Sequence, residues 1–72
     1  SRFYFLISDM KTYYIAFTVF DDDAIHTEEI SFKDNDEINS DTIKEALENL
    51  YRDEYYEEDP IIKQIISWSK NE

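Results

Sequence analysis

The 72-residue sequence contains no cysteine and no glycine, and it has only one proline and one histidine. Without cysteine, no disulfide holds the chain together, which excludes the small stapled scaffolds of secreted proteins and is typical of a reducing compartment. Without glycine, the chain lacks the phosphate-binding loops of nucleotide-dependent enzymes and the glycine-flanked serine of many hydrolases. A zinc site would depend on His26 and carboxylates alone, which is a poor ligand set.

Long apolar segments are also absent from the sequence. No apolar run approaches the roughly 20 residues that span a bilayer. The first eleven residues, SRFYFLISDMK, contain five consecutive apolar or aromatic residues before Asp9 interrupts them. This run is too short for the core of a signal peptide, and no small-residue cleavage site follows it. We therefore expect a cytoplasmic protein.

Acidic residues dominate the composition. Asp and Glu together number 18 against seven Lys and Arg, so the formal net charge is −11. Such a charge is typical of disordered chains, but six tyrosines, five phenylalanines and one tryptophan supply apolar surface that disordered chains lack. The sequence therefore predicts one folded domain over residues 1–72. Its negative field opposes binding to nucleic acid or to an anionic membrane and favours a basic protein partner.

The first half of the sequence predicts a sheet. Residues 2–8, 12–20 and 24–33 are rich in aromatic and β-branched residues, and short polar turns separate them. Turns this short join neighbouring antiparallel strands, so the three segments are expected to form a three-stranded β-meander.

The second half predicts two helices. In residues 39–58, apolar side chains recur at helical spacing, and either Ser40 or Asp41 is the expected N-cap. The predicted fold class is α+β, in the order βββαα, with both helices packed on one face of the sheet.

The second of these helices is predicted over residues 59–70. Asp59 is its expected N-cap and Pro60 its first helical residue. Helical spacing favours a core position for Trp68, with a contact residue as the alternative. The apolar stripe of this helix comprises Ile61, Ile62, Ile65, Ile66 and Trp68.

The sheet face turned away from the helices is expected to carry Tyr4, Leu6, Tyr14 and Phe20. One interpretation is that these side chains are half-buried where the sheet curls around a helix. The other is that they form a dimerisation or docking face, because contiguous exposed apolar surface marks interaction sites. The pattern leaves both interpretations open.

Two acidic stretches invite comparison with metal sites and do not match them. Residues 34–45 place acids at positions 1, 3 and 12 of a calcium loop, but Ile38 and Asn39 occupy positions where that loop needs a ligand and a glycine. Residues 21–26 combine three aspartates with His26, yet neighbours along a strand point to opposite faces. The sequence therefore predicts no metal, no cofactor and no catalytic residue, and the protein is not expected to be an enzyme.

The stretch YRDEYYEEDP, residues 51–60, is the strongest candidate for a functional surface. After Arg52 no basic residue follows until Lys63, and acids at the end of a helix oppose its dipole. Tyrosines lie between the acids, and tyrosine is favoured in binding hot spots. The alternative is that the acids only keep the protein soluble. The predicted partner-binding residues are Asp53, Glu54, Tyr55, Tyr56, Glu57 and Glu58, with Asp21, Asp22 and Asp23 extending the surface.

In size, charge and element order the sequence resembles the small acidic inhibitors of phages and mobile elements, which include anti-CRISPR proteins and DNA mimics. The resemblance implies a non-catalytic protein in the bacterial host cytoplasm that inhibits a basic, nucleic-acid-binding host protein. It would do so by offering carboxylates where that protein expects phosphates. The alternative is a structural or regulatory interaction module, including a homodimer, that acts through its apolar sheet face while the acids provide solubility.

Overall fold

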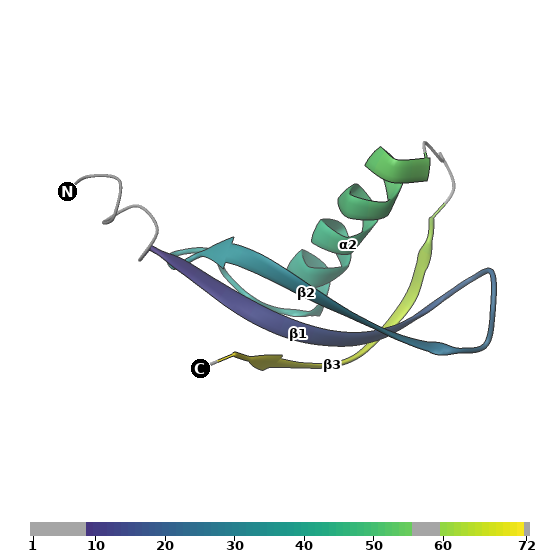
Figure 1. Cartoon of the computed structure of the whole chain (residues 1–72), viewed down its shortest axis with the longest axis horizontal. Coiled ribbons are helices and arrows are strands. Elements are labelled where there is room, and N and C mark those ends of the chain that lie inside the picture. Colours follow the sequence, from purple (N-terminus) through teal and green to yellow (C-terminus); the bar gives the residue numbers. More distant parts are fainter. Residues whose placement is uncertain (1–8, 56–59, 72) are drawn as a thin grey trace.

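A computed structural model of the chain describes residues 9–55 and 60–71, with the side chains of residues 53–55 left out of the description. Figure 1 shows one helix lying across one face of a twisted sheet. The elements in chain order are β1 (Met10–Val19), β2 (Ile25–Lys33), α2 (Ser40–Tyr55) and β3 (Ile62–Lys70). The strand order in the sheet is β2-β1-β3, and both outer strands run antiparallel to β1.

The predicted hairpin is confirmed over most of its length. Successive side chains along β1 and β2 point to alternate faces of the sheet. The register pairs Met10 with Lys33 at one end and Thr18 with Ile25 at the other. Strand β1 begins at Met10, two residues earlier than predicted. The strand predicted over residues 2–8 lies outside the described residues.

The prediction of two helices in the order βββαα is wrong. The described residues contain a single helix, and Ile62–Lys70 forms an edge strand paired with β1. The protein is a small α+β domain in which the third described strand follows the helix. Because β1 has β2 on only one side, its other edge offers a full row of backbone partners that residues 62–70 fill.

Two β-bulges explain why β3 resembles a helix in sequence. Two register shifts interrupt the pairing of β1 with β3. Each bulge inserts one extra residue and resets the alternation of faces, so apolar residues three apart return to the same side of the sheet. The β-branched isoleucines also favour a strand over a helix. The cross-strand partners on the helix-covered face are Val19 with Ile62, Phe17 with Ile65 and Ile15 with Trp68.

The core lies between the sheet and one face of α2. Trp68 does not belong to it: 40 % of this residue is exposed, because β3 is an edge strand and no described strand flanks its outer side. The helical prediction that favoured a core position for Trp68 is therefore wrong. The fully buried side chains are Ile15, Phe17, Ile43, Leu47 and Ile62.

The helix N-terminus is capped by Asn39 rather than by Ser40 or Asp41. The Asn39 Oδ1 atom accepts hydrogen bonds from the backbone N–H groups of Asp41 and Thr42, both at 2.9 Å. The Thr42 hydroxyl accepts the Asn39 N–H at 3.0 Å in return. This reciprocal pattern satisfies backbone donors that a helix start leaves open.

No helix among the described residues is long and apolar enough to cross a membrane.

Candidate functional site

The predicted aspartate turn and the C-terminal end of α2 lie toward the same end of the molecule. The turn between β1 and β2 holds Asp21, Asp22 and Asp23, all of them exposed. The start of β3 lies beside this turn, since the Phe20 N–H donates to the Ile61 carbonyl at 3.1 Å. The C-terminal end of α2 also points toward this end (Figure 1). Asp53, Glu54 and Tyr55 form the last turn of α2, while Tyr56, Glu57 and Glu58 lie outside the described residues.

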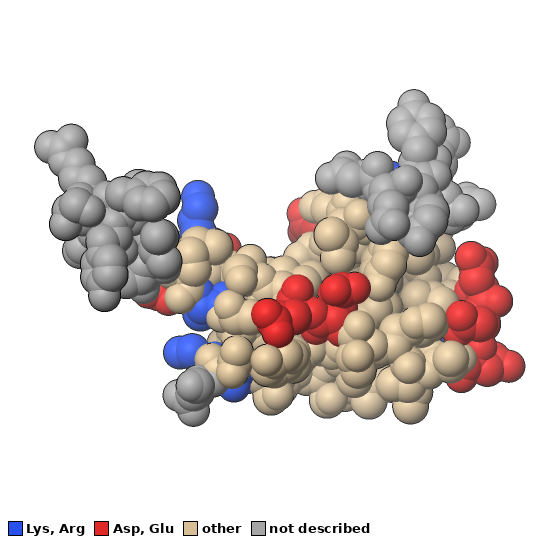
Figure 2. Space-filling model, viewed as in Figure 1, with Lys and Arg blue, Asp and Glu red and all other residues tan. Residues whose placement is uncertain are grey.

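Charge is distributed unevenly along the sheet. Figure 2 shows one group of acidic atoms at the end where β1 and β2 are joined, another near the middle of this face, and most of the visible basic atoms at the opposite end. Lys11, Lys33 and Lys70 lie at that opposite end, where β1 starts and β2 and β3 finish. No described lysine or arginine forms an ion pair with the three aspartates of the turn.

Asp22 organises the acidic turn. Its carboxylate accepts the backbone N–H of Ala24 at 2.9 Å and lies 3.0 Å from His26 Nε2. The hydrogen bond with His26, and after it the one from Ala24, holds the pKa of Asp22 below its ordinary value. The His26 ring in turn stacks on Phe17, with ring centroids 5.7 Å apart. His26 therefore anchors the turn to the core.

This geometry predicts that Asp22 titrates at a lower pH than an ordinary aspartate. Because its folded-state pKa is depressed, its contribution to stability is present at neutral pH and is lost as the pH falls through that pKa. The carboxyl carbon shift of Asp22, followed by NMR through an acid titration, measures the effect. We expect His26→Gln to return the Asp22 midpoint toward the ordinary aspartate value. An unchanged midpoint in that variant would contradict the role assigned to His26.

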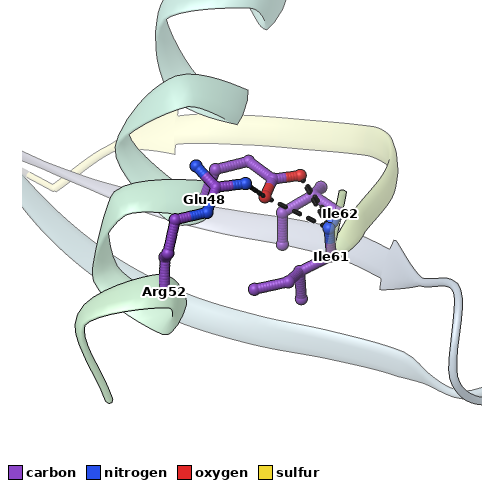
Figure 3. A network of polar contacts seen from close by, with 4 residues as sticks. All are labelled: Glu48, Arg52, Ile61 and Ile62. Carbon is purple, nitrogen blue, oxygen red and sulfur yellow. Dashed lines mark hydrogen bonds and ion pairs between the residues drawn. The ribbon is translucent and has the colours of Figure 1, made fainter. Parts of the chain in front are cut away.

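Glu48 joins the helix to the start of β3, as Figure 3 shows. Its carboxylate accepts the backbone N–H of Ile61 at 2.9 Å and that of Ile62 at 2.9 Å, and Arg52 Nη2 lies 3.1 Å from its Oε1 atom. Glu48 and Arg52 are four residues apart and form an ion pair on the same side of α2. The two backbone contacts were not predicted, because a carboxylate 13 and 14 residues from its donors leaves no periodic signal in the sequence.

Tyr51 makes a second link, from α2 to β2. Its hydroxyl donates to Glu28 Oε2 at 3.0 Å, and its ring lies 6.0 Å from that of Phe17. Glu28 is therefore turned toward the helix, away from the opposite sheet face. Both Glu28 and Glu48 act as internal anchors within the described structure.

A shallow hollow of about 300 Å³ lies between α2 and the connection from β2. Three exposed carboxylates border it, those of Asp36, Glu37 and Glu45. Phe32 and Ala46 are among its apolar lining residues. The sequence predicted no site at these carboxylates, which lie in the stretch that does not match a calcium loop. The described residues contain no cluster of His, Cys, Asp or Glu arranged to hold a metal ion.

The sheet face turned away from α2 is uncovered by any described element, and we refer to it as the open face. Tyr14 and Phe20 of the predicted docking face are 49 % and 59 % exposed, while Tyr4 and Leu6 lie outside the described residues. A hydrogen bond with Glu29, followed by its negative charge, raises the pKa of Tyr14. The strand residues of the open face are Met10, Thr12, Tyr14, Ala16, Thr18, Ile25, Thr27, Glu29, Ser31, Lys33, Gln64, Ser67 and Ser69.

Comparison of the chain with models of protein families, with curated proteins and with solved structures gave no match. The functional interpretation therefore depends on the chemistry of these surfaces.

Proposed function

We propose that this protein is a non-catalytic inhibitor that binds the basic surface of a nucleic-acid-binding protein. The observation that carries the proposal is the exposed aspartate turn, residues 21–23, at the same end of the molecule as the acidic end of α2. The net charge of −11 adds a long-range attraction toward any basic partner. Inhibition would follow from occupancy, because a groove filled by carboxylates is closed to phosphates.

The uneven charge distribution gives the encounter a preferred orientation. The aspartate turn carries three carboxylates with no described lysine or arginine paired to them, whereas Lys11, Lys33 and Lys70 lie at the far end. A basic groove attracts the aspartate turn more strongly than the far end, where lysines lie beside Asp9 and Asp34, so the protein approaches turn first. The anchoring of Asp22 through His26 reduces the conformational freedom that the turn would lose on binding.

The binding experiment starts from a nuclease-treated bacterial lysate, so that no nucleic acid bridges two proteins. The immobilised chain is washed at about 0.1 M and then about 1 M salt, conditions that shorten the screening length from roughly 10 Å to roughly 3 Å. We expect a nucleic-acid-binding protein to elute at high salt, and its own nucleic acid to compete with the chain for the purified partner. A partner that stays bound at high salt, or is not displaced by nucleic acid, would contradict the proposal.

A matched pair of variants tests whether the aspartate turn is the contact. Asp21→Lys with Asp23→Lys should weaken binding by more than about tenfold, because both changes replace attraction by repulsion. Asp9→Lys with Asp34→Lys makes the same change in net charge at the opposite end and should leave affinity within about threefold. Equal losses in both pairs would assign the effect to net charge and would overturn the turn as the site. Glu54→Lys with Glu57→Lys tests the predicted remainder of the surface in the same assay.

A further inference from the structure

The open face is almost free of charge in a protein that is otherwise strongly acidic. Among the thirteen residues that the strand register places on this face, only Glu29 and Lys33 are charged, and their formal charges cancel; the exposed bulge residues Lys63 and Ile66 have no partner in the register. Hydroxyl-bearing side chains fill most of the remaining positions, and Thr12 and Ser31 bond to each other across the strands at 2.9 Å. Tyr14 lies near the centre of the face, with Met10 and Ile25 toward its ends.

We infer that the open face is the interface of a homodimer, in which two copies pack sheet against sheet. Two copies that each carry a charge of −11 repel each other wherever their acids meet. The open face is the described surface on which they approach with least repulsion. This inference goes beyond the proposed function, because it leaves the aspartate turn of each copy at an end of the sheet and available to a partner.

The two sheet edges are less suitable for a symmetric contact. Pairing β2 with its own copy would bring Glu28 and Glu29 of both chains together. Strand β3 carries two exposed lysines, Lys63 and Lys70. Like charges on directly opposed strands are destabilising, and lysine on an edge strand is a common protection against edge pairing.

The size of the open face is close to what a specific interface requires. Strands about 4.8 Å apart and nine residues long at about 3.3 Å per residue cover roughly 14 Å by 30 Å. Because side chains project from this plane, the accessible area is on the order of 500 Å² per copy. A dimer would then bury about 1,000 Å² in total, at the lower limit for specific association. Tyr14 supplies the large aromatic anchor that such interfaces favour.

The small core gives a second reason for association. The described residues contain five fully buried side chains, and the sequence has no cysteine to form a disulfide. Domains of this size often gain stability by oligomerisation. Packing two open faces together would bury a second layer against β1, whose other side already faces the core.

Sedimentation equilibrium tests the inference directly. At about 100 µM we expect a mass near twice the 8.7 kDa of the chain. Added salt should strengthen the dimer, since it screens repulsion between like-charged copies, whereas the same salt should weaken binding to a basic partner. The salt responses therefore separate this inference from the proposed function. A mass of one chain at this concentration would overturn the inference.

A pair of variants locates the interface. Thr27→Lys places a lysine on the open face and should give a monomer, while Asn49→Lys makes the same charge change on α2 and should remain dimeric. Circular dichroism should show the same fold for both, because both positions are exposed. If both variants remain dimeric, or if only Asn49→Lys becomes monomeric, the open face is not the dimer interface. If the chain is monomeric and Thr27→Lys weakens binding of the captured partner, the open face belongs to that partner.

Discussion

Replacement of Phe17 by alanine is expected to lower the free energy of unfolding by about 3–5 kcal/mol. The side chain is fully buried, and its ring lies between the His26 ring at 5.7 Å and the Tyr51 ring at 6.0 Å. Removing a buried phenylalanine costs about 3–5 kcal/mol. A 72-residue chain at about 0.05–0.15 kcal/mol per residue has roughly 4–11 kcal/mol of total stability. The single substitution therefore removes a large share of the total.

Phe20→Ala is the matched control, because it makes the same chemical change three residues away at a side chain that is 59 % exposed. We expect it to cost less than about 1 kcal/mol. Thermal unfolding followed by circular dichroism measures both variants, and Phe17→Ala should lower the midpoint by at least roughly 12 °C. Similar midpoints for the two variants would show that the core is not centred on Phe17.

Replacement of Glu48 by alanine should also lower the free energy of unfolding substantially. Its carboxylate, whose side chain is only 12 % exposed, accepts two backbone N–H groups where β3 begins. Their loss leaves two donors without a partner, at about 1–3 kcal/mol for each donor that water does not reach. Because Ile61 is half-buried and Ile62 fully buried, we expect a total loss of about 2–4 kcal/mol.

Glu45→Ala is the control for Glu48, since Glu45 lies on the same helix with its side chain exposed. We expect Glu45→Ala to lower the free energy of unfolding by no more than about 0.5 kcal/mol. Amide hydrogen exchange gives a local measurement: the N–H groups of Ile61 and Ile62 should exchange faster in Glu48→Ala and at an unchanged rate in Glu45→Ala. Glu48→Gln, which keeps one acceptor oxygen, should fall between the two. Unchanged exchange in Glu48→Ala would contradict the anchoring role.

The hairpin and the helix were predictable because their signals are local. Alternation along β1 and β2, with a polar turn between them, specifies an antiparallel pair before any other contact is known. The helical spacing of Ile43 and Leu47 likewise specifies which face of α2 is buried. The N-cap could be placed only within a few polar residues, because Asn39, Ser40 and Asp41 are all good capping residues.

Strand β3 was mispredicted because its bulges imitate helical periodicity. Ile62, Ile65 and Trp68 are three residues apart, which fits one side of a helix. The same spacing fits one side of a strand when a bulge adds one residue between each of these residues and the next. Only the pairing with β1, a contact between residues more than forty positions apart, distinguishes the two.

For the candidate site, the amino-acid sequence predicted the acidic character of the surface but not where its parts lie in the fold. The excess of acids and the clustering of Asp21–Asp23 can be read directly from the sequence. That this turn lies beside the start of β3 depends on the bond between Phe20 and Ile61. The hollow bordered by Asp36, Glu37 and Glu45 also escaped prediction, because it forms only when α2 packs beside the end of β2.

The amino-acid sequence by itself determined the chemistry available to this protein: an acidic surface, no thiol, no glycine loop, and enough aromatic residues to fold. It also determined the hairpin of β1 and β2 and the helix α2, whose signals are local. The tertiary structure decided the identity of β3, the place of the aspartate turn beside the start of β3, and the presence of a nearly neutral open face. Those properties depend on which distant strands pair and which face the helix covers, and pairing energy belongs to two segments jointly, so neither segment reveals it alone.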